Sequence, residues 1–232
     1  MQTTITTKKM NNGISTAKAN RLYWMGRYAE RVYLALHMLR KYHDQMIDED
    51  YNAYNDFCSK MRIENKYSTP AQFIESYLYD ELNSDSIINM LELVHDNAML
   101  LREEIMSETL SYIQMSIFYM KNARDKSMGL VDLQTITDYM LAFWGSVDER
   151  ISNYSIRKTI KYGKFVESMD LHIRFGYPFE RIISINGRLQ ESIEKESELC
   201  DEIKLIALKN QLTFDKFNEE KTLYYLNGLF TA

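Results

Sequence analysis

Residues 22–31 read LYWMGRYAER and place a glycine, two arginines and a glutamate in a segment whose apolar residues have helical spacing. Residues 160–170 read IKYGKFVESMD and form a weaker copy when Gly26 is aligned on Gly163, 137 residues later. The alignment also pairs Arg27 with Lys164, Tyr28 with Phe165, Glu30 with Glu167 and Leu34 with Leu171. A glycine inside a helix costs about 1 kcal/mol relative to alanine, so both glycines require a physical reason. Close approach of two helices, or a binding site, would supply that reason.

The composition indicates a helical protein. The chain has 232 residues with only 8 Gly and 2 Pro, and 45% of its residues are hydrophobic. Apolar residues recur at steps of three and four through residues 22–39, and no stretch shows the alternation of a half-buried strand. We therefore expect an all-α fold, a bundle of long antiparallel helices with short connections. The two glycine segments leave open a division into two related halves.

Local signals divide the chain into segments. We expect residues 1–14 to be a disordered lead and residues 15–232 to form a single helical domain. Thr69 before a proline is a strong helix start, because threonine can cap the helix and proline fits its first turn. Residues 126–129 read as a loop. The highly charged residues 191–209 have helical propensity and are predicted to be helical with a solvated face.

Charge and hydropathy exclude several classes of protein. The net charge of −5 argues against a general nucleic-acid-binding face, which needs a basic surface. No apolar run approaches the roughly 20 residues of a membrane span, and residues 1–15 lack the apolar core of a signal peptide. Two cysteines without a CxxC spacing, Cys58 and Cys200, suit a reducing compartment. We expect a cytoplasmic protein with no membrane and no nucleic-acid partner.

The sequence contains no complete signature of a catalytic or metal site. It has no Gly-x-Ser-x-Gly elbow, no phosphate-binding loop and no Gly-x-Gly-x-x-Gly turn. Glu92 and His95 form one Glu-x-x-His step, but di-iron bundles need two such steps and two further glutamates. We therefore predict no metal and no cofactor, and the residues leave open whether the protein is an enzyme.

The charges of the glycine segments form the candidate site. Arg27, Glu30 and Arg31 project on adjoining faces of one helix, among aromatic residues that leave little room for solvent. Buried charges must be paired, so we expect the two helices to cross at their glycines about a local two-fold. In this arrangement Glu30 pairs with Lys164, and Glu167 pairs with Arg27. A structural ion-pair network and a ligand site are both open interpretations.

A second polar group is predicted farther along the chain. Asn97 is disfavoured inside a helix, which suggests a buried hydrogen-bonding role in a network with Arg102.

These residues resemble a known family. The run from Ala19 to Arg31 is similar to the opening signature of the alpha-E family, an all-helical domain named for its Glu-Arg motif. Supporting blocks, by resemblance, are Tyr79-Asp80 with Asn83, Ser86 and Ile87, then Asp96-Asn97-Ala98 with Arg102, and Gly145 with Arg157, Gly163, Lys164 and Glu167. The chain departs from the pattern at Lys164, where the family has arginine, and at Ser168, which replaces the second arginine of a Glu-Arg pair.

The resemblance implies a role without fixing a reaction. Members accompany circularly permuted ATP-grasp ligases and transglutaminase-like peptidases, which implies a binding or scaffold partner in a system that forms and cleaves peptide or amide bonds. The alternative is an enzyme or peptide-substrate binder that uses the Arg/Glu cluster, with arginines holding carboxylates and Glu30 or Glu167 as the base. The substrate and the oligomeric state are not predicted.

Overall fold

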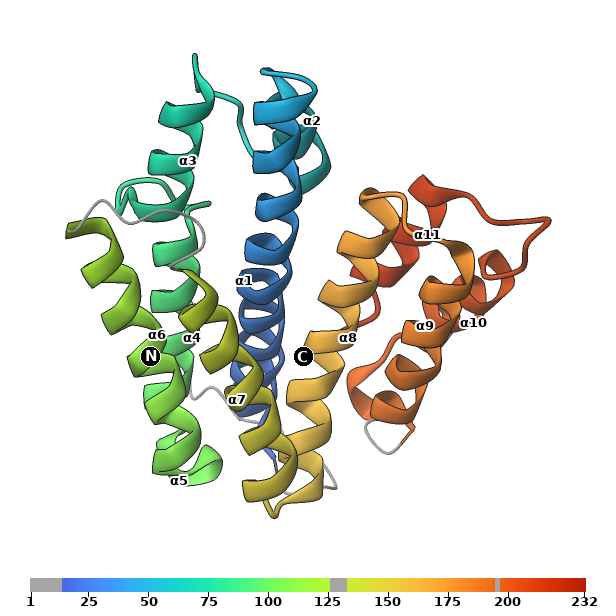
Figure 1. Cartoon of the computed structure of the whole chain (residues 1–232). Helices are drawn as coiled ribbons and strands as arrows, with labels where there is room; N and C mark the ends of the chain where they lie inside the picture. The colour runs from blue at the N-terminus through green and yellow to red at the C-terminus, as the bar shows by residue number, and fades with distance from the viewer. Residues whose placement is uncertain (1–13, 126–132, 195–196) are drawn as a thin grey trace, which may run out of the picture.

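The computed structural model describes residues 14–125, 133–194 and 197–232 (Figure 1). The described residues are mainly helical and contain no strand, and an isolated bridge joins Cys200 and Phe230. The α-helices are α1 (Thr16–Asp48), α2 (Ala53–Met61), α3 (Pro70–Tyr79), α4 (Ile87–Leu100), α5 (Arg102–Ile105), α6 (Ser107–Asp125), α7 (Gln134–Arg150), α8 (Tyr154–Arg174), α9 (Phe179–Ile193), α10 (Glu202–Gln211) and α11 (Glu219–Asn227). The expected lead, apart from Ile14, and the expected loop at 126–129 lie outside the described residues.

Polar side chains cap the beginnings of α1 and α3, and the cap of α3 is the start that the sequence predicts. The Oγ1 atom of Thr69 accepts a hydrogen bond from the backbone N–H of Gln72 at 3.2 Å, and Pro70 occupies the first turn of α3. Ser15 caps α1 in the same way. After α8 the chain reverses at Gly176, whose φ of +67° lies in the left-handed region that glycine tolerates. These signals are local, which is why they can be read from sequence.

The prediction of helix through residues 191–209 is wrong in its middle. Helix α9 ends at Ile193, a 3₁₀ turn covers Ser197–Leu199, and α10 begins only at Glu202. Asp201 caps α10 by accepting a hydrogen bond from the backbone N–H of Lys204 at 3.0 Å. Its own N–H donates to the carbonyl of Leu229 at 2.8 Å, beyond the end of α11. This tertiary contact takes the place of a helical hydrogen bond.

The bundle is built around α1, which packs against α4, α7 and α8 (Figure 1). Successive long helices such as α6 and α7, or α8 and α9, are antiparallel, as expected. The central pair α1 and α8 instead runs parallel. Tyr23 and Tyr162 are in ring contact near the beginnings of these helices, and Tyr42 contacts Phe175 near their ends. Corresponding positions of the two glycine segments are therefore side by side.

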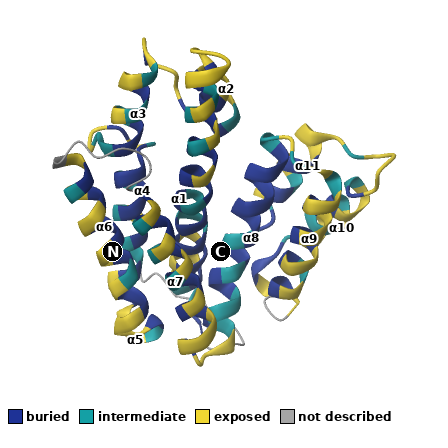
Figure 2. Cartoon of the chain, viewed as in Figure 1, coloured by how far each residue is buried: buried dark blue, intermediate teal, exposed yellow. Residues whose placement is uncertain are grey.

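Each helix turns an apolar face inward. Figure 2 shows buried stripes on the sides of α1, α4 and α8 that face one another, with exposed residues on the outside of the bundle. In the described part of the chain, no helix combines the length and the apolar character needed to cross a membrane.

The C-terminal helices cover one side of α8. Leu223, Leu226 and Leu229 are buried there. Phe230 stacks on Tyr23 of α1, with ring centroids 3.8 Å apart. Stacked aromatic rings bury much apolar surface, so this contact anchors the end of the chain beside the start of α1.

Candidate functional site

Two glycines allow α1 and α8 to touch through their backbones. A Cβ atom at Gly26 would lie 2.1 Å from the carbonyl oxygen of Ile160, and one at Gly163 would lie 2.0 Å from that of Tyr23. Each glycine thus meets the carbonyl three residues before the other glycine, which is the reciprocity of a local two-fold. The predicted crossing is confirmed, and its reason is steric: no side chain fits at either position.

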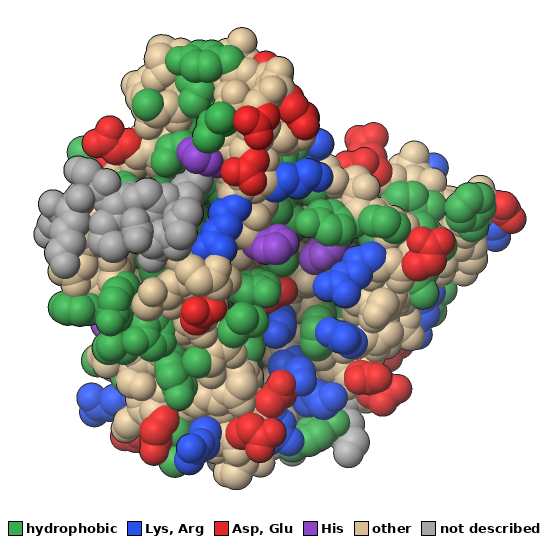
Figure 3. Space-filling model, viewed as in Figure 1, with side chains coloured by type: hydrophobic (Ala, Val, Ile, Leu, Met, Phe, Trp, Pro, Cys, Tyr) green, Lys and Arg blue, Asp and Glu red, His purple; other side chains and the backbone are tan. Residues whose placement is uncertain are grey.

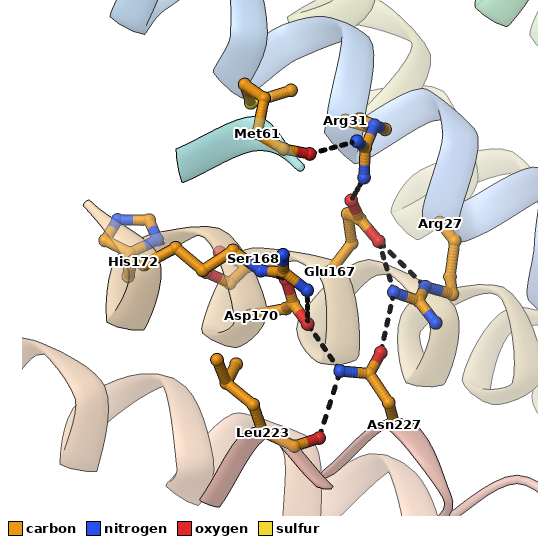
Figure 4. A network of polar contacts seen from close by, with 10 residues as sticks. Arg27, Arg31, Met61, Glu167, Ser168, Asp170, His172, Leu223 and Asn227 are labelled. Atoms are coloured by element: carbon orange, nitrogen blue, oxygen red, sulfur yellow. Dashed lines mark hydrogen bonds and ion pairs between the residues drawn. The ribbon is translucent and has the colours of Figure 1, made fainter. Parts of the chain in front are cut away.

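On one side of the crossing, Glu167 is held by two arginines of α1 (Figure 4). Its Oε2 atom lies 2.6 Å from Nη2 and 2.8 Å from Nε of Arg27. Its Oε1 atom lies 2.9 Å from Nη1 of Arg31. The Glu167 side chain is only 2% exposed, whereas Arg27 and Arg31 are 12% and 21% exposed. The ion pair expected between Arg27 and Glu167 is present.

The same arginines connect this pair to other helices. Arg31 donates to the carbonyl of Met61 at the end of α2 at 3.0 Å, and Arg27 donates to Oδ1 of Asn227 on α11 at 3.1 Å. The amide nitrogen of Asn227 donates in turn to the buried carboxylate of Asp170 on α8 (Figure 4). We call Arg27, Arg31, Glu167, Asp170 and Asn227 the sealed cluster. It links four helices through hydrogen bonds to charged groups, which are the stronger kind.

Electrostatics keeps the arginines of the sealed cluster charged. Burial by itself would lower the pKa of Arg27, but the adjacent Glu167 carboxylate raises it above its ordinary value. The same two opposing effects leave the pKa of Arg31 raised. The pKa of Tyr23 is raised to about 12, chiefly by burial, so this phenol stays neutral.

On the other side of the crossing, Glu30 has no arginine. The side chain is 4% exposed, and Lys164, Ser168 and Trp144 surround its carboxyl group. The expected ion pair with Lys164 is not formed. The ammonium group of Lys164 lies over the Trp144 ring instead, 4.0 Å from the ring centroid, in a cation–π contact. The local two-fold relates Arg31 to Ser168. Glu30 therefore has no counterpart of the second arginine that holds Glu167.

The consequence is an acid that titrates near neutral pH. Burial raises the pKa of Glu30 from 4.5 to about 7, and the charge of Lys164, with the polar groups of Ser168 and Trp144, offsets only part of this effect. The Oε2 atom of Glu30 has no hydrogen-bond partner, as expected of a carboxyl group whose ionised form is poorly stabilised. The two glutamates of the repeated segments are therefore equivalent in position and different in environment.

Three predicted site residues lie away from both glutamates. Asn97 bonds the carbonyl of Leu93 in its own helix and lines a surface pocket of about 310 Å³ beside Trp24. Arg102 is exposed, so the buried network expected for Asn97 and Arg102 is absent. Arg157 donates to the carbonyl of Ile151 at 2.6 Å, where it supports the turn between α7 and α8. Asn97 and Arg102 belong to α4 and α5, and Arg157 lies at the start of α8, so none of them reaches the crossing.

Sequence analysis missed three residues that the structure brings to the crossing. Asp170 lies within the repeated segment, one helical turn after Glu167, so its position could have been noticed. Trp144 precedes Gly145 in a block that resembles the family, but its contact with Lys164 requires α7 to pack on α8. Asn227 carries no signal in the sequence, because its role depends wholly on where α11 lies.

The comparison with protein families agrees with the geometry. The Alpha-E family model, described as a predicted alpha-helical domain with a conserved ER motif, matches residues 16–196. The match contains both glycine segments, and the only Glu-Arg pair in either of them is Glu30-Arg31. Helices α10 and α11 lie beyond the matched residues. No curated protein and no solved structure matches the chain.

Proposed function

Because the chain belongs to the Alpha-E family, we propose that it acts in the cytoplasm as a binding or scaffold protein rather than as an enzyme. The observation that carries this proposal is the state of Glu167. Two arginines occupy both of its oxygens, and the carboxylate is 2% exposed. Guanidinium groups hold both oxygens of this carboxylate, so Glu167 is not available as a base in this arrangement.

The sealed cluster explains instead how a rigid surface is maintained. Ion pairs between α1 and α8 fix the rotation of these helices about their shared crossing, and α2 and α11 are bonded to the same arginines. Charged groups buried in a network hold one arrangement, because any other leaves a charge unpaired. A rigid bundle of this kind suits the presentation of a surface to another protein.

The partners that we propose follow from the family resemblance. They are a circularly permuted ATP-grasp ligase and a transglutaminase-like peptidase, which form and cleave peptide or amide bonds. The test is to capture the ligase encoded in the same genome on the immobilised full chain, and then to measure the ligase rate with and without added chain. Retention of the ligase with a changed rate supports the proposal. No retention, and no change in rate at saturating chain, refutes it.

A second candidate function is supported by Glu30. A carboxyl group with a pKa of about 7 can take or give a proton near neutral pH, which is the requirement for a general acid or base. In that case Lys164 would hold the substrate carboxylate, and the protein would be an enzyme or a peptide-substrate binder. Purified Glu30→Gln chain that forms the ligase complex and alters the ligase rate as fully as the parent chain would refute this alternative.

A further inference from the structure

One face of the molecule brings positively charged side chains together from two helices. On α8, Lys161 and Lys164 are three residues apart and lie on one side, with the buried His172 at a similar angle beneath them. On α9, Arg181 and Arg188 are seven residues apart and share a side. We call Lys161, Lys164, Arg181 and Arg188 the basic face. Figure 3 shows Lys and Arg side chains following one another down the middle of this view, below two histidines.

The cations of the basic face are close enough to repel one another. Burial lowers the pKa of Lys164, the carboxyl groups of Glu30 and Asp148 oppose this shift, and the charges of Lys161 and Arg188 add to it. Burial lowers the pKa of the adjacent His172, and the charge of Arg181 lowers it further, so this imidazole stays neutral. Repulsion between like charges lowers the stability of the folded chain, so the positive potential of this face is maintained at a cost in folding free energy.

Carboxyl groups offset part of the charge of the basic face, and Glu30 lies near Lys164. Asp148 pairs with Lys161, with Nζ and Oδ1 2.7 Å apart. In the described part of the chain, Arg181 and Arg188 are exposed and form no ion pair, and Lys164 contacts the Trp144 ring. The exposed guanidinium groups are therefore available to another molecule, although the chain as a whole has a net charge of −5.

We propose that the basic face binds a short acidic segment of a partner protein, with Arg181 and Arg188 holding its carboxylates. The proposal rests on the proposed function, a binding protein, and names the surface and the chemistry that this function would use. Guanidinium groups match carboxylates in a two-point geometry, and exposed complementary charges speed the encounter of two proteins.

The balance of charge favours a short acidic peptide over a nucleic acid. A long polyanion gains affinity by neutralising many phosphates along its length. Outside the basic face this chain carries more acidic than basic residues, so a polymer that ran past the face would meet repulsion. A short acidic segment ends before that happens.

The test uses the full chain and a fluorescein-labelled deca-glutamate peptide, with binding followed by anisotropy at about 50 mM salt, where charge interactions are weakly screened. One variant carries Arg181→Glu and Arg188→Glu. A matched control carries Lys66→Glu and Lys216→Glu, which change the net charge equally at exposed positions in loops outside α8 and α9. Circular dichroism verifies that both variants are folded. We expect the face variant to bind about tenfold more weakly than the parent chain, and the control to bind within about twofold.

Three results would overturn the proposal: no binding of the peptide by the parent chain, equal weakening by both variants, or tighter binding of a single-stranded RNA of equal charge. Failure here differs from failure of the proposed function, because no ligase is present in this experiment. Capture of the ligase by the face variant as well as by the parent chain would refute the assignment of the surface and leave the partnership intact.

Discussion

Glu30 and Glu167 offer a matched pair of substitutions. They occupy equivalent positions about the crossing of α1 and α8, and both are almost fully buried. Replacement of either by glutamine removes one ionisable group and keeps the size of the side chain. Their surroundings differ, because Glu167 has two arginines and Glu30 has Lys164 turned toward an indole ring. We therefore expect opposite effects on stability.

The magnitude for Glu30 follows from its pKa. The folded chain holds the Glu30 proton up to about pH 7, whereas the unfolded chain releases it near 4.5. Because the folded pKa is the higher one, this group's stabilisation is complete below the unfolded pKa and declines as the pH rises to the folded pKa. The loss between these limits amounts to about 3 kcal/mol of unfolding free energy.

The Glu30→Gln chain should therefore match the parent chain at about pH 4 and exceed its unfolding free energy by up to about 3 kcal/mol at about pH 8. The Glu167→Gln chain leaves Arg27 and Arg31 buried without their counter-charge, so it should lose about 3–5 kcal/mol at both pH values. Urea unfolding followed by circular dichroism measures both. Other titrating groups are common to all three chains and cancel in the comparison.

Two outcomes would refute this reasoning. One is a Glu30→Gln chain that is less stable than the parent at the higher pH, which would mean that the ionised carboxylate is well satisfied. The other is a difference between these chains that stays constant from the lower to the higher pH, which would mean that Glu30 does not titrate in this range.

Further predictions concern packing, hydrogen bonding and thiol chemistry. Gly163→Ala should lower the unfolding free energy by about 3 kcal/mol, because the new methyl group would clash with the carbonyl oxygen of Tyr23. Gly145 has open space around it, so Gly145→Ala should raise the unfolding free energy by about 0.5–1 kcal/mol in the same urea assay. Asn227→Ala should cost about 1–3 kcal/mol in thermal or urea unfolding, because two buried charged partners lose their amide; an unchanged midpoint would contradict this. Burial raises the pKa of Cys58 to about 12, so a thiol reagent at mild alkaline pH should label it only after unfolding, in a variant lacking the other cysteine.

The sequence by itself determined the features that depend on neighbours along the chain. Apolar spacing fixed the helices, and Thr69 with its proline fixed the start of α3. The crossing of α1 and α8 could also be predicted from the sequence. A glycine inside a helical pattern implies that another helix approaches closely, and the repeated segment indicates which helix that is. The pair Arg27–Glu167 followed from burial of charge in that crossing.

Only the tertiary structure decided what surrounds each glutamate at the crossing. Asn227 reaches Arg27, next to Glu167, because α11 packs on α8. Lys164 contacts the Trp144 ring and forms no ion pair with Glu30, because α7 lies beside α8. The break near Asp201 likewise depends on a contact with the end of α11. These outcomes depend on helices far apart in the chain, whose relative placement is set by the packing of the whole core. Local periodicity indicates which face of a helix is buried, but it does not indicate which residues of other helices that face contacts.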